Sequence, residues 1–260
     1  MCTINGFALW GGGGASHRDF MKAYWVWGAY AAKNPDAAGI AWAEHGNAES
    51  FYYKKAPGRS HNLVGRVAVP PEGAITAIMH TRYATHGEPE NNANNHPFVG
   101  EQFALIHNGI ASDALDVAKN LPLAGECDSE AIAAIVEAIG DPLAAGRFCL
   151  QALRGRQAVA IIEKATGNLT LWCNEPGALY YAATMRGIWF ATTREGVLRM
   201  ATRRVKVQPF LGVETFHPSG ETVAVEVKLS THRKVKRVVY TGGRLTQTLS
   251  TQSRYVGPWE

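Results

Sequence analysis

The chain has few cysteines, little net charge and no long apolar run, and each shortage excludes a class of protein. Only 4 of its 260 residues are cysteines, and no pair of them has the spacing of a metal site. A net charge of +4 is too small to favour a nucleic acid as partner. No apolar stretch is long enough to cross a bilayer, and no secretion signal is recognisable at the start. We therefore expect a cytoplasmic protein without a membrane segment, a metal or a cofactor.

The remaining composition is that of a folded protein with both helices and strands. Apolar residues make up 46% of the chain and charged residues 18%, which is typical of a globular domain. Apolar periodicity predicts helices over about 16–33 and 128–139. Short apolar runs predict strands at 2–9, 38–43, 50–53, 74–80, 103–107, 158–162, 169–172, 179–182, 188–191 and 223–227. Helices mixed with largely antiparallel strands indicate the α+β class.

The last part of the chain differs in composition from the rest. Basic side chains are frequent from Lys228 onward, and residues 245–253 are rich in Thr, Ser and Gln. We therefore predict a main domain over residues 1–230 and a basic C-terminal extension over 231–260. A solvated edge strand with a loose terminus is the favoured interpretation of this extension. Docking to a partner or to an anionic substrate is the alternative.

Cys2 directly follows the initiator methionine, Met1. Removal of Met1 would leave a residue that carries both a thiol and a free α-amine. The α-amine titrates near neutrality, at about pH 7.7–8, so its neutral form can accept the thiol proton. One residue would then supply both nucleophile and base. Most cysteines at this position have no catalytic role, so the interpretation depends on residues further along the chain.

Three polar positions downstream together suit the binding of an amino acid. Arg82 follows a buried strand and could hold a carboxylate with both arms of its guanidinium, although a surface salt bridge is the commoner fate of an isolated arginine. Asn108-Gly109 is expected to end the strand 103–107 as a turn, or else to form an oxyanion hole. Asp128 opens a helix, so it could cap that helix or bind a ligand ammonium. With a nucleophile, this set fits an α-amino acid whose side-chain carbonyl is attacked, and glutamine is the natural candidate.

Five sequence motifs resemble those of the class II glutamine amidotransferases, a branch of the N-terminal nucleophile hydrolases. They occur in the order, and with approximately the spacing, that is usual in that family. The resemblance covers about residues 2–227 and is strongest to the glutaminase domain of the glucosamine-6-phosphate synthases. The motifs are Met-Cys at the start, HTRYATHGEP at 80–89, Asn95-His96-Pro97, HNG at 107–109 and Asp128-Ser129-Glu130.

The resemblance implies the fold and the catalytic residues. The fold would be the four-layer αββα sandwich of the N-terminal nucleophile hydrolases, with residues 1–230 forming the glutaminase domain. Cys2 would be the nucleophile and its α-amine the base. Asn108 and Gly109 would form the oxyanion hole.

The resemblance also implies how glutamine would be bound. Arg82 would bind the α-carboxylate of glutamine, with Thr85 and His86 in support, and Asp128 would bind the α-ammonium. The chain departs from the family pattern at Cys127, where a threonine is usual, and in lacking an acceptor domain after residue 227.

These observations favour a free-standing glutamine amidotransferase that hydrolyses glutamine and passes ammonia to an acceptor on a separate synthase. A hydrolase of γ-glutamyl amides without ammonia transfer is the first alternative, because its substrates share the γ-glutamyl group. A non-catalytic regulatory subunit with the same fold is the second.

Overall fold

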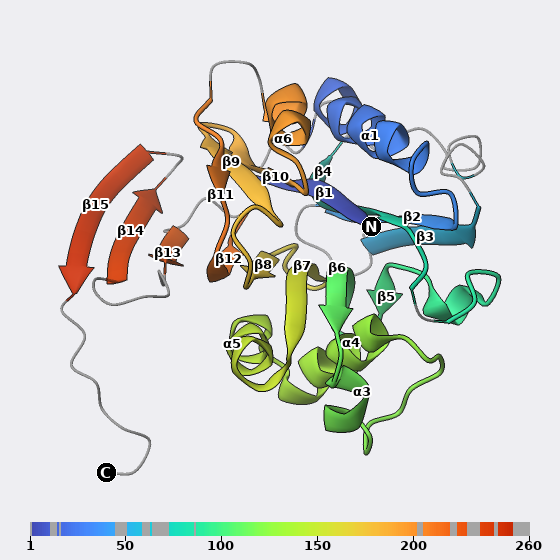
Figure 1. The fold of residues 1–260 in the computed structure, drawn as a ribbon. Coiled ribbons are helices and arrows are strands. Elements are labelled where there is room, and N and C mark those ends of the chain that lie inside the picture. The colour runs from blue at the N-terminus through green and yellow to red at the C-terminus, as the bar shows by residue number, and fades with distance from the viewer. Residues whose placement is uncertain are drawn as a thin grey trace, which may run out of the picture.

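Two antiparallel sheets, packed face to face, form the centre of the protein (Figure 1). This arrangement is seen in a computed structural model, which describes residues 2–10, 15, 17–44, 51–58, 63, 73–85, 87–201 and 205–218, and the backbone of 223–227, 235–241 and 244–251. The seven-stranded sheet has the order β11-β9-β10-β1-β4-β2-β3, and the five-stranded sheet has the order β12-β8-β7-β6-β5.

The strands have the following bounds. The larger sheet contains β1 (Thr3–Leu9), β2 (Ala37–Glu44), β3 (Phe51–Pro57), β4 (Ala74–Arg82), β9 (Tyr180–Thr184), β10 (Gly187–Ala191) and β11 (Gln208–Pro209). The smaller sheet contains β5 (Phe98–Val99), β6 (Phe103–Ala111), β7 (Gly155–Glu163), β8 (Leu169–Cys173) and β12 (Gly212–Phe216). A third sheet contains β13 (Val223–Val227), β14 (Val235–Thr241) and β15 (Arg244–Thr251).

Helices cover the outer faces of both central sheets (Figure 1). The larger sheet is covered by α1 (His17–Ala31) and α6 (Arg194–Ala201), and the smaller one by α4 (Asp128–Ile139) and α5 (Pro142–Ala152), with the short α3 (Ala114–Val117) beside them. This is the αββα sandwich that the family resemblance implies. No helix in the described part of the chain is long and apolar enough to span a membrane.

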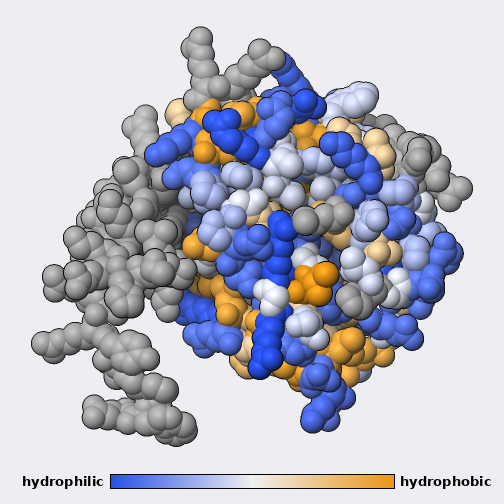
Figure 2. Space-filling model, viewed as in Figure 1, coloured by the Kyte–Doolittle hydropathy of each residue, from blue (hydrophilic) through white to orange (hydrophobic). Residues whose placement is uncertain are grey.

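Strand alternation divides the apolar side chains of the larger sheet between two cores. On β1, Ile4 and Ala8 face the second sheet, whereas Phe7 and Leu9 pack with α1. The face of the protein seen in Figure 2 carries mainly hydrophilic side chains, with smaller hydrophobic areas between them. Burial of the apolar side chains between the layers is the main favourable contribution to folding.

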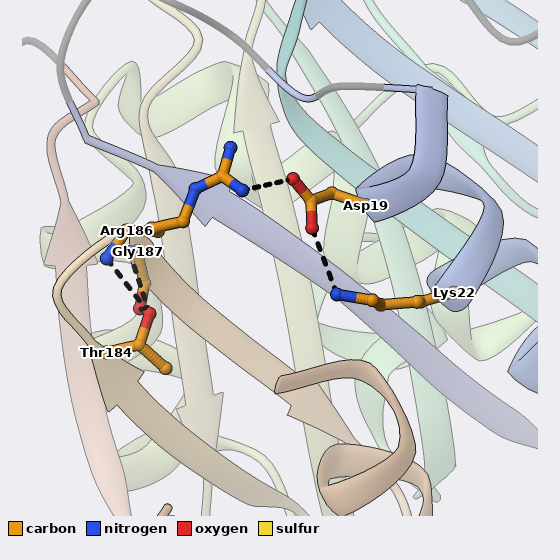
Figure 3. Close-up of polar contacts among 5 residues, drawn as sticks. All are labelled: Asp19, Lys22, Thr184, Arg186 and Gly187. Atoms are coloured by element: carbon orange, nitrogen blue, oxygen red, sulfur yellow. Dashed lines mark hydrogen bonds and ion pairs between the residues drawn. The ribbon is translucent and has the colours of Figure 1, made fainter. Parts of the chain in front are cut away.

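An ion pair joins the start of α1 to the turn between β9 and β10 (Figure 3). The buried carboxylate of Asp19 accepts from Lys22 Nζ at 3.1 Å and from Arg186 at 2.7 Å. Thr184 Oγ1 accepts from the backbone N–H groups of Arg186 and Gly187, which orders the turn itself. The start of helix α1 is thereby held against the turn that lies next to the end of β1, away from Cys2.

The expected turn at Asn108-Gly109 is wrong, because β6 continues through both residues to Ala111. Gly109 pairs with Gln157 on β7. A Cβ atom on Gly109 would lie 1.9 Å from the carbonyl oxygen of Arg156. The glycine therefore permits close approach of two strands and does not form a turn.

The prediction for residues 128–139 is confirmed as α4, which ends at Gly140 in the left-handed conformation with φ 73°. The last strand expected from the sequence, 223–227, is followed by two more. Because β13 pairs with β14, backbone hydrogen bonds cross the predicted division at residue 230, which stays a prediction. Residues 228–234 and 252–260 lie outside the described part of the chain.

Candidate active site

The side chains of Cys2, Arg82 and Asn108 belong to the facing sides of the two central sheets. Ile4 and Ile106, two positions from Cys2 and Asn108, lie in the core between the sheets. Because side chains alternate along a strand, residues two positions apart share a face. The same alternation places Arg82 on the inner face of β4.

A hydrogen bond between β4 and β6 shows that these residues lie at one level of the sandwich. His80 Nε2 on β4 donates to the carbonyl oxygen of His107 on β6 at 3.1 Å. Arg82 and Asn108 therefore lie one or two residues beyond this bridge on their respective strands. Thr3 pairs with Thr81, so the start of β1 also reaches this level.

The thiol of Cys2 is half-buried and lies against the backbone of Tyr83. Its Sγ accepts from the Tyr83 N–H at 3.3 Å and donates to the Tyr83 carbonyl at 3.4 Å. Burial raises the pKa of the Cys2 thiol, and the negative charge of Asp128 raises it further. The hydrogen bond from Tyr83 and the positive charge of Arg82 lower this pKa. The charges of Arg82 and Asp128 thus both act on the thiol. At neutral pH the thiol is protonated and needs a base to react.

The guanidinium of Arg82 is buried and oriented by a loop. Only 2% of Arg82 is exposed. Its Nη1 donates to Asn95 Oδ1 and its Nη2 donates to the Gly87 carbonyl, both at 2.8 Å. Asn95 in turn donates through Nδ2 to the Pro89 carbonyl at 2.7 Å. This burial argues against the surface salt bridge that was the alternative, and it gives the planar group a fixed direction.

Thr85 and His86 are the two residues expected to support Arg82. Thr85 lies on the exposed part of the loop after β4. His86 lies outside the described residues. Their supporting roles stay predictions.

Asn108 carries a buried amide without a hydrogen-bond partner among the described residues. The residue is 0% exposed, and neither Nδ2 nor Oδ1 has a partner there. Leaving such a group unpaired costs about 1–3 kcal/mol, and exceptions of this kind are found where a polar group serves catalysis or a ligand. The amide is therefore available to an oxygen atom that enters the site.

Asp128 is held by hydrogen bonds at the first turn of α4. The N-cap residue is Cys127, so Asp128 does not have the capping role that the sequence left open. Its Oδ2 accepts from the Ala111 N–H at 2.7 Å, and its Oδ1 accepts from Ser129 Oγ at 3.2 Å. Ser129 Oγ also lies 2.9 Å from His107 Nδ1. The carboxylate is thus fixed at the end of β6, beside Ala111, which follows Asn108 on the same strand.

The histidines near the site are packed inside the protein. The rings of His80 and His96 stack with centroids 3.8 Å apart. Burial lowers the pKa of His80 to about 3 and that of His96 well below its usual value. Both rings are therefore neutral at physiological pH and structural in character. Nowhere in the described part do three His, Cys, Asp or Glu side chains form a group that could hold a metal ion.

Two antiparallel sheets between layers of helices, with Cys2 just before the central strand β1, characterise the fold. Two solved structures are similar at 17% identity, which shows the fold alone. The glutamine phosphoribosylpyrophosphate amidotransferase of B. subtilis has a TM-score of 0.60, covering 84% of this chain and 49% of that one. A structure described as the allosteric regulatory enzyme of purine biosynthesis has a TM-score of 0.62 with the same coverage.

Sequence comparisons define the family more closely. A family model described as a glutamine amidotransferase domain matches residues 80–199. The glutamine–fructose-6-phosphate aminotransferase (isomerizing) of Brucella abortus is 30% identical over 198 residues, which cover 72% of this chain and 30% of that protein. The enzyme of the same name from Helicobacter pylori is 30% identical over 170 residues, 61% of this chain and 28% of that protein. The chain thus spans about a third of the length of these relatives, and it carries a class II glutamine amidotransferase domain.

Proposed function

We propose that this chain hydrolyses glutamine to glutamate and ammonia through a γ-glutamyl thioester on Cys2. The observation that carries the proposal is the buried Asn108 amide, which has no partner among the described residues and belongs, like Cys2 and the buried Arg82, to the facing sides of the two sheets. Arg82 suits the α-carboxylate of glutamine and Asp128 suits its α-ammonium. Thr85 and His86 would support the Arg82 contact.

The chemistry begins with proton transfer from the Cys2 thiol. The α-amine of Cys2, free once Met1 is removed, accepts this proton while Sγ attacks the side-chain carbonyl carbon of glutamine. The ammonium so formed donates the proton to the departing nitrogen, which leaves as ammonia. Water then attacks the thioester, releasing glutamate and restoring the thiol.

The negative oxygen of the tetrahedral intermediate needs donors that are already in place. The Asn108 amide and the Gly109 N–H supply them in this proposal. Because the Asn108 amide is buried and has no partner among the described residues, it need not break an existing bond to act. Such preorganisation is worth about 2.7–4 kcal/mol per donor in comparable sites.

We further propose that the ammonia passes to an acceptor on a separate synthase. The named relatives are glutamine–fructose-6-phosphate aminotransferases, of which this chain matches about a third. The proposal predicts that nitrogen from glutamine labelled with ¹⁵N at its amide enters an acceptor product only when the partner synthase is present. Label found only in free ammonia, with every candidate partner from the native host, would contradict transfer.

The hydrolytic step is tested by measuring glutamate release by the purified protein and two cysteine variants. Cys2→Ala should abolish turnover. Cys149→Ala is the matched control, because Cys149 is a fully buried thiol on α5. Activity retained in Cys2→Ala would refute the assignment. Cleavage of γ-glutamyl anilide without cleavage of glutamine would instead favour a γ-glutamyl amide hydrolase.

A further inference from the structure

Lys55 extends from the edge strand β3 to the loop that holds Arg82. Its Nζ donates to the carbonyl oxygen of Asn95 at 2.7 Å and lies 5.2 Å from the centre of the Phe98 ring. The Lys55 carbonyl accepts from Asn92 Nδ2 at 3.3 Å. The lysine therefore contacts the loop with both its backbone and its ammonium. No sequence motif marks it.

Asn95 connects this lysine to the candidate carboxylate-binding arginine. Asn95 is fully buried. Its carbonyl oxygen accepts from Lys55 while its side-chain oxygen accepts from Arg82 at 2.8 Å. A shift of the Asn95 backbone would therefore move the acceptor that orients the guanidinium.

The ammonium of Lys55 is largely withdrawn from water, which costs free energy. Burial lowers the pKa of Lys55 to about 8, and the negative charge of Glu130 opposes this. Glu130 comes from the first turn of α4, and the Lys55 charge in turn acts on the neutral His96. An ammonium is withdrawn from water only where strong hydrogen bonds or aromatic rings replace its hydration.

We propose that Lys55 is a positioning residue for glutamine: it fixes Asn95, and Asn95 fixes the guanidinium of Arg82. This inference rests on the proposed function, in which Arg82 binds the glutamine α-carboxylate. The carboxylate is distant from the reacting amide and keeps its charge throughout the reaction. Loss of Lys55 should therefore raise KM and leave kcat nearly unchanged, because binding is weakened equally in the ground and transition states.

The experiment measures kcat, KM and the melting temperature of Lys55→Met, Lys55→Arg and Asn95→Ala. Lys54→Met is the matched control, because the neighbouring lysine on β3 points to the opposite face of the sheet. We expect KM for glutamine to rise about tenfold in Lys55→Met, which corresponds to about 1.4 kcal/mol. Lys55→Arg keeps the cation and should recover part of the affinity, while Lys54→Met should match the wild type.

A double variant shows whether Lys55 acts through Asn95. If it does, Lys55→Met combined with Asn95→Ala should have the KM of Asn95→Ala alone, because the connection is already broken. Additive increases in KM, or a fall in kcat with KM unchanged, would overturn the inference. If Lys55→Met does not fold, an unchanged KM in Asn95→Ala would overturn it in the same way.

The outcome also separates this inference from the proposed function. A wild-type protein that hydrolyses glutamine, with an unchanged KM in Lys55→Met, would refute the role of Lys55 alone. A wild-type protein that does not hydrolyse glutamine would refute the proposed function and this inference with it.

Discussion

Replacing Asn108 with alanine should lower kcat for glutamine by about 100- to 1,000-fold and leave KM within a few-fold, because an oxyanion donor acts mainly in the transition state. The same change should hardly affect stability. The Asn108 amide makes no hydrogen bond to any described residue, so none of these bonds is lost on truncation. Removing an unpaired buried amide also removes a cost of about 1–3 kcal/mol, which offsets the small cavity left behind.

The expected change in the melting temperature is therefore less than about 4 °C in either direction, the equivalent of about 1 kcal/mol for a chain of this size. Steady-state glutaminase kinetics test the expected fall in kcat, and a thermal melt on the same samples tests the expected small change in melting temperature. Asn5→Ala is the matched control: Asn5 is also fully buried, but its Nδ2 donates to the Ala23 carbonyl at 3.0 Å. The control should lose stability and keep kcat.

Two results would refute this reasoning. A rise in KM without a fall in kcat would place Asn108 in substrate binding and remove it from the oxyanion hole. A large loss of stability would show that the amide is a structural group with a partner in the folded protein.

Three further outcomes are expected. Gly109→Ala should lower the melting temperature by several degrees and reduce kcat, because the new Cβ would lie 1.9 Å from the Arg156 carbonyl; unchanged melting would contradict the close approach. Burial lowers the pKa of His80 to about 3, whereas in the unfolded chain this histidine takes up its proton near pH 6.5. The free energy of unfolding should therefore fall as the pH drops below 6.5, by up to about 1.4 kcal/mol per pH unit. Urea unfolding at pH values between about 7 and 5 measures this, and a flat profile would contradict it. Arg186→Ala should lower the free energy of unfolding by roughly 1 kcal/mol, because the ion pair with Asp19 is lost. It should leave kcat unchanged, because this ion pair lies at the opposite end of β1 from Cys2. A fall in kcat would contradict this prediction.

The parts of the fold that could be predicted from the sequence are those with strong local signals. Helix α4 was predicted over its full length because an acidic first turn and Gly140 mark its two ends. Helix α5 was missed although it carries such a signal: Asp141 accepts from the N–H groups of Leu143 and Ala144, and proline occupies the first turn. The strands β14 and β15 lie in the segment for which the sequence favoured one solvated edge strand and a loose terminus, so the second strand was not predicted.

Asn108-Gly109 shows where local reasoning fails. This dipeptide favours a turn on its own. Here the backbone of β7 passes so close that only glycine fits at position 109, and the strand continues. Such an approach depends on a residue almost fifty positions away, so no local pattern could reveal it.

Part of the candidate site could be predicted from the sequence, and part is seen only in the structure. The motifs predict Cys2, Arg82 and Asp128 as one set, and in the structure the charges of Arg82 and Asp128 both influence the pKa of the Cys2 thiol. The sequence could not show that the Asn108 amide lacks a partner among the described residues. It also could not show that Asn95 joins Lys55 to Arg82, because these residues belong to separate segments that only the fold brings together.

The central claim is that Cys2 attacks the side-chain carbonyl of glutamine as the terminal residue of the mature chain. The most direct test is to incubate the purified protein with the glutamine analogue 6-diazo-5-oxo-L-norleucine and locate the adduct by peptide mass spectrometry. We predict a single adduct on Cys2, in a peptide that begins at Cys2 because Met1 has been removed, and protection by excess glutamine. Labelling of Cys127, or a retained Met1 on an active protein, would contradict the account.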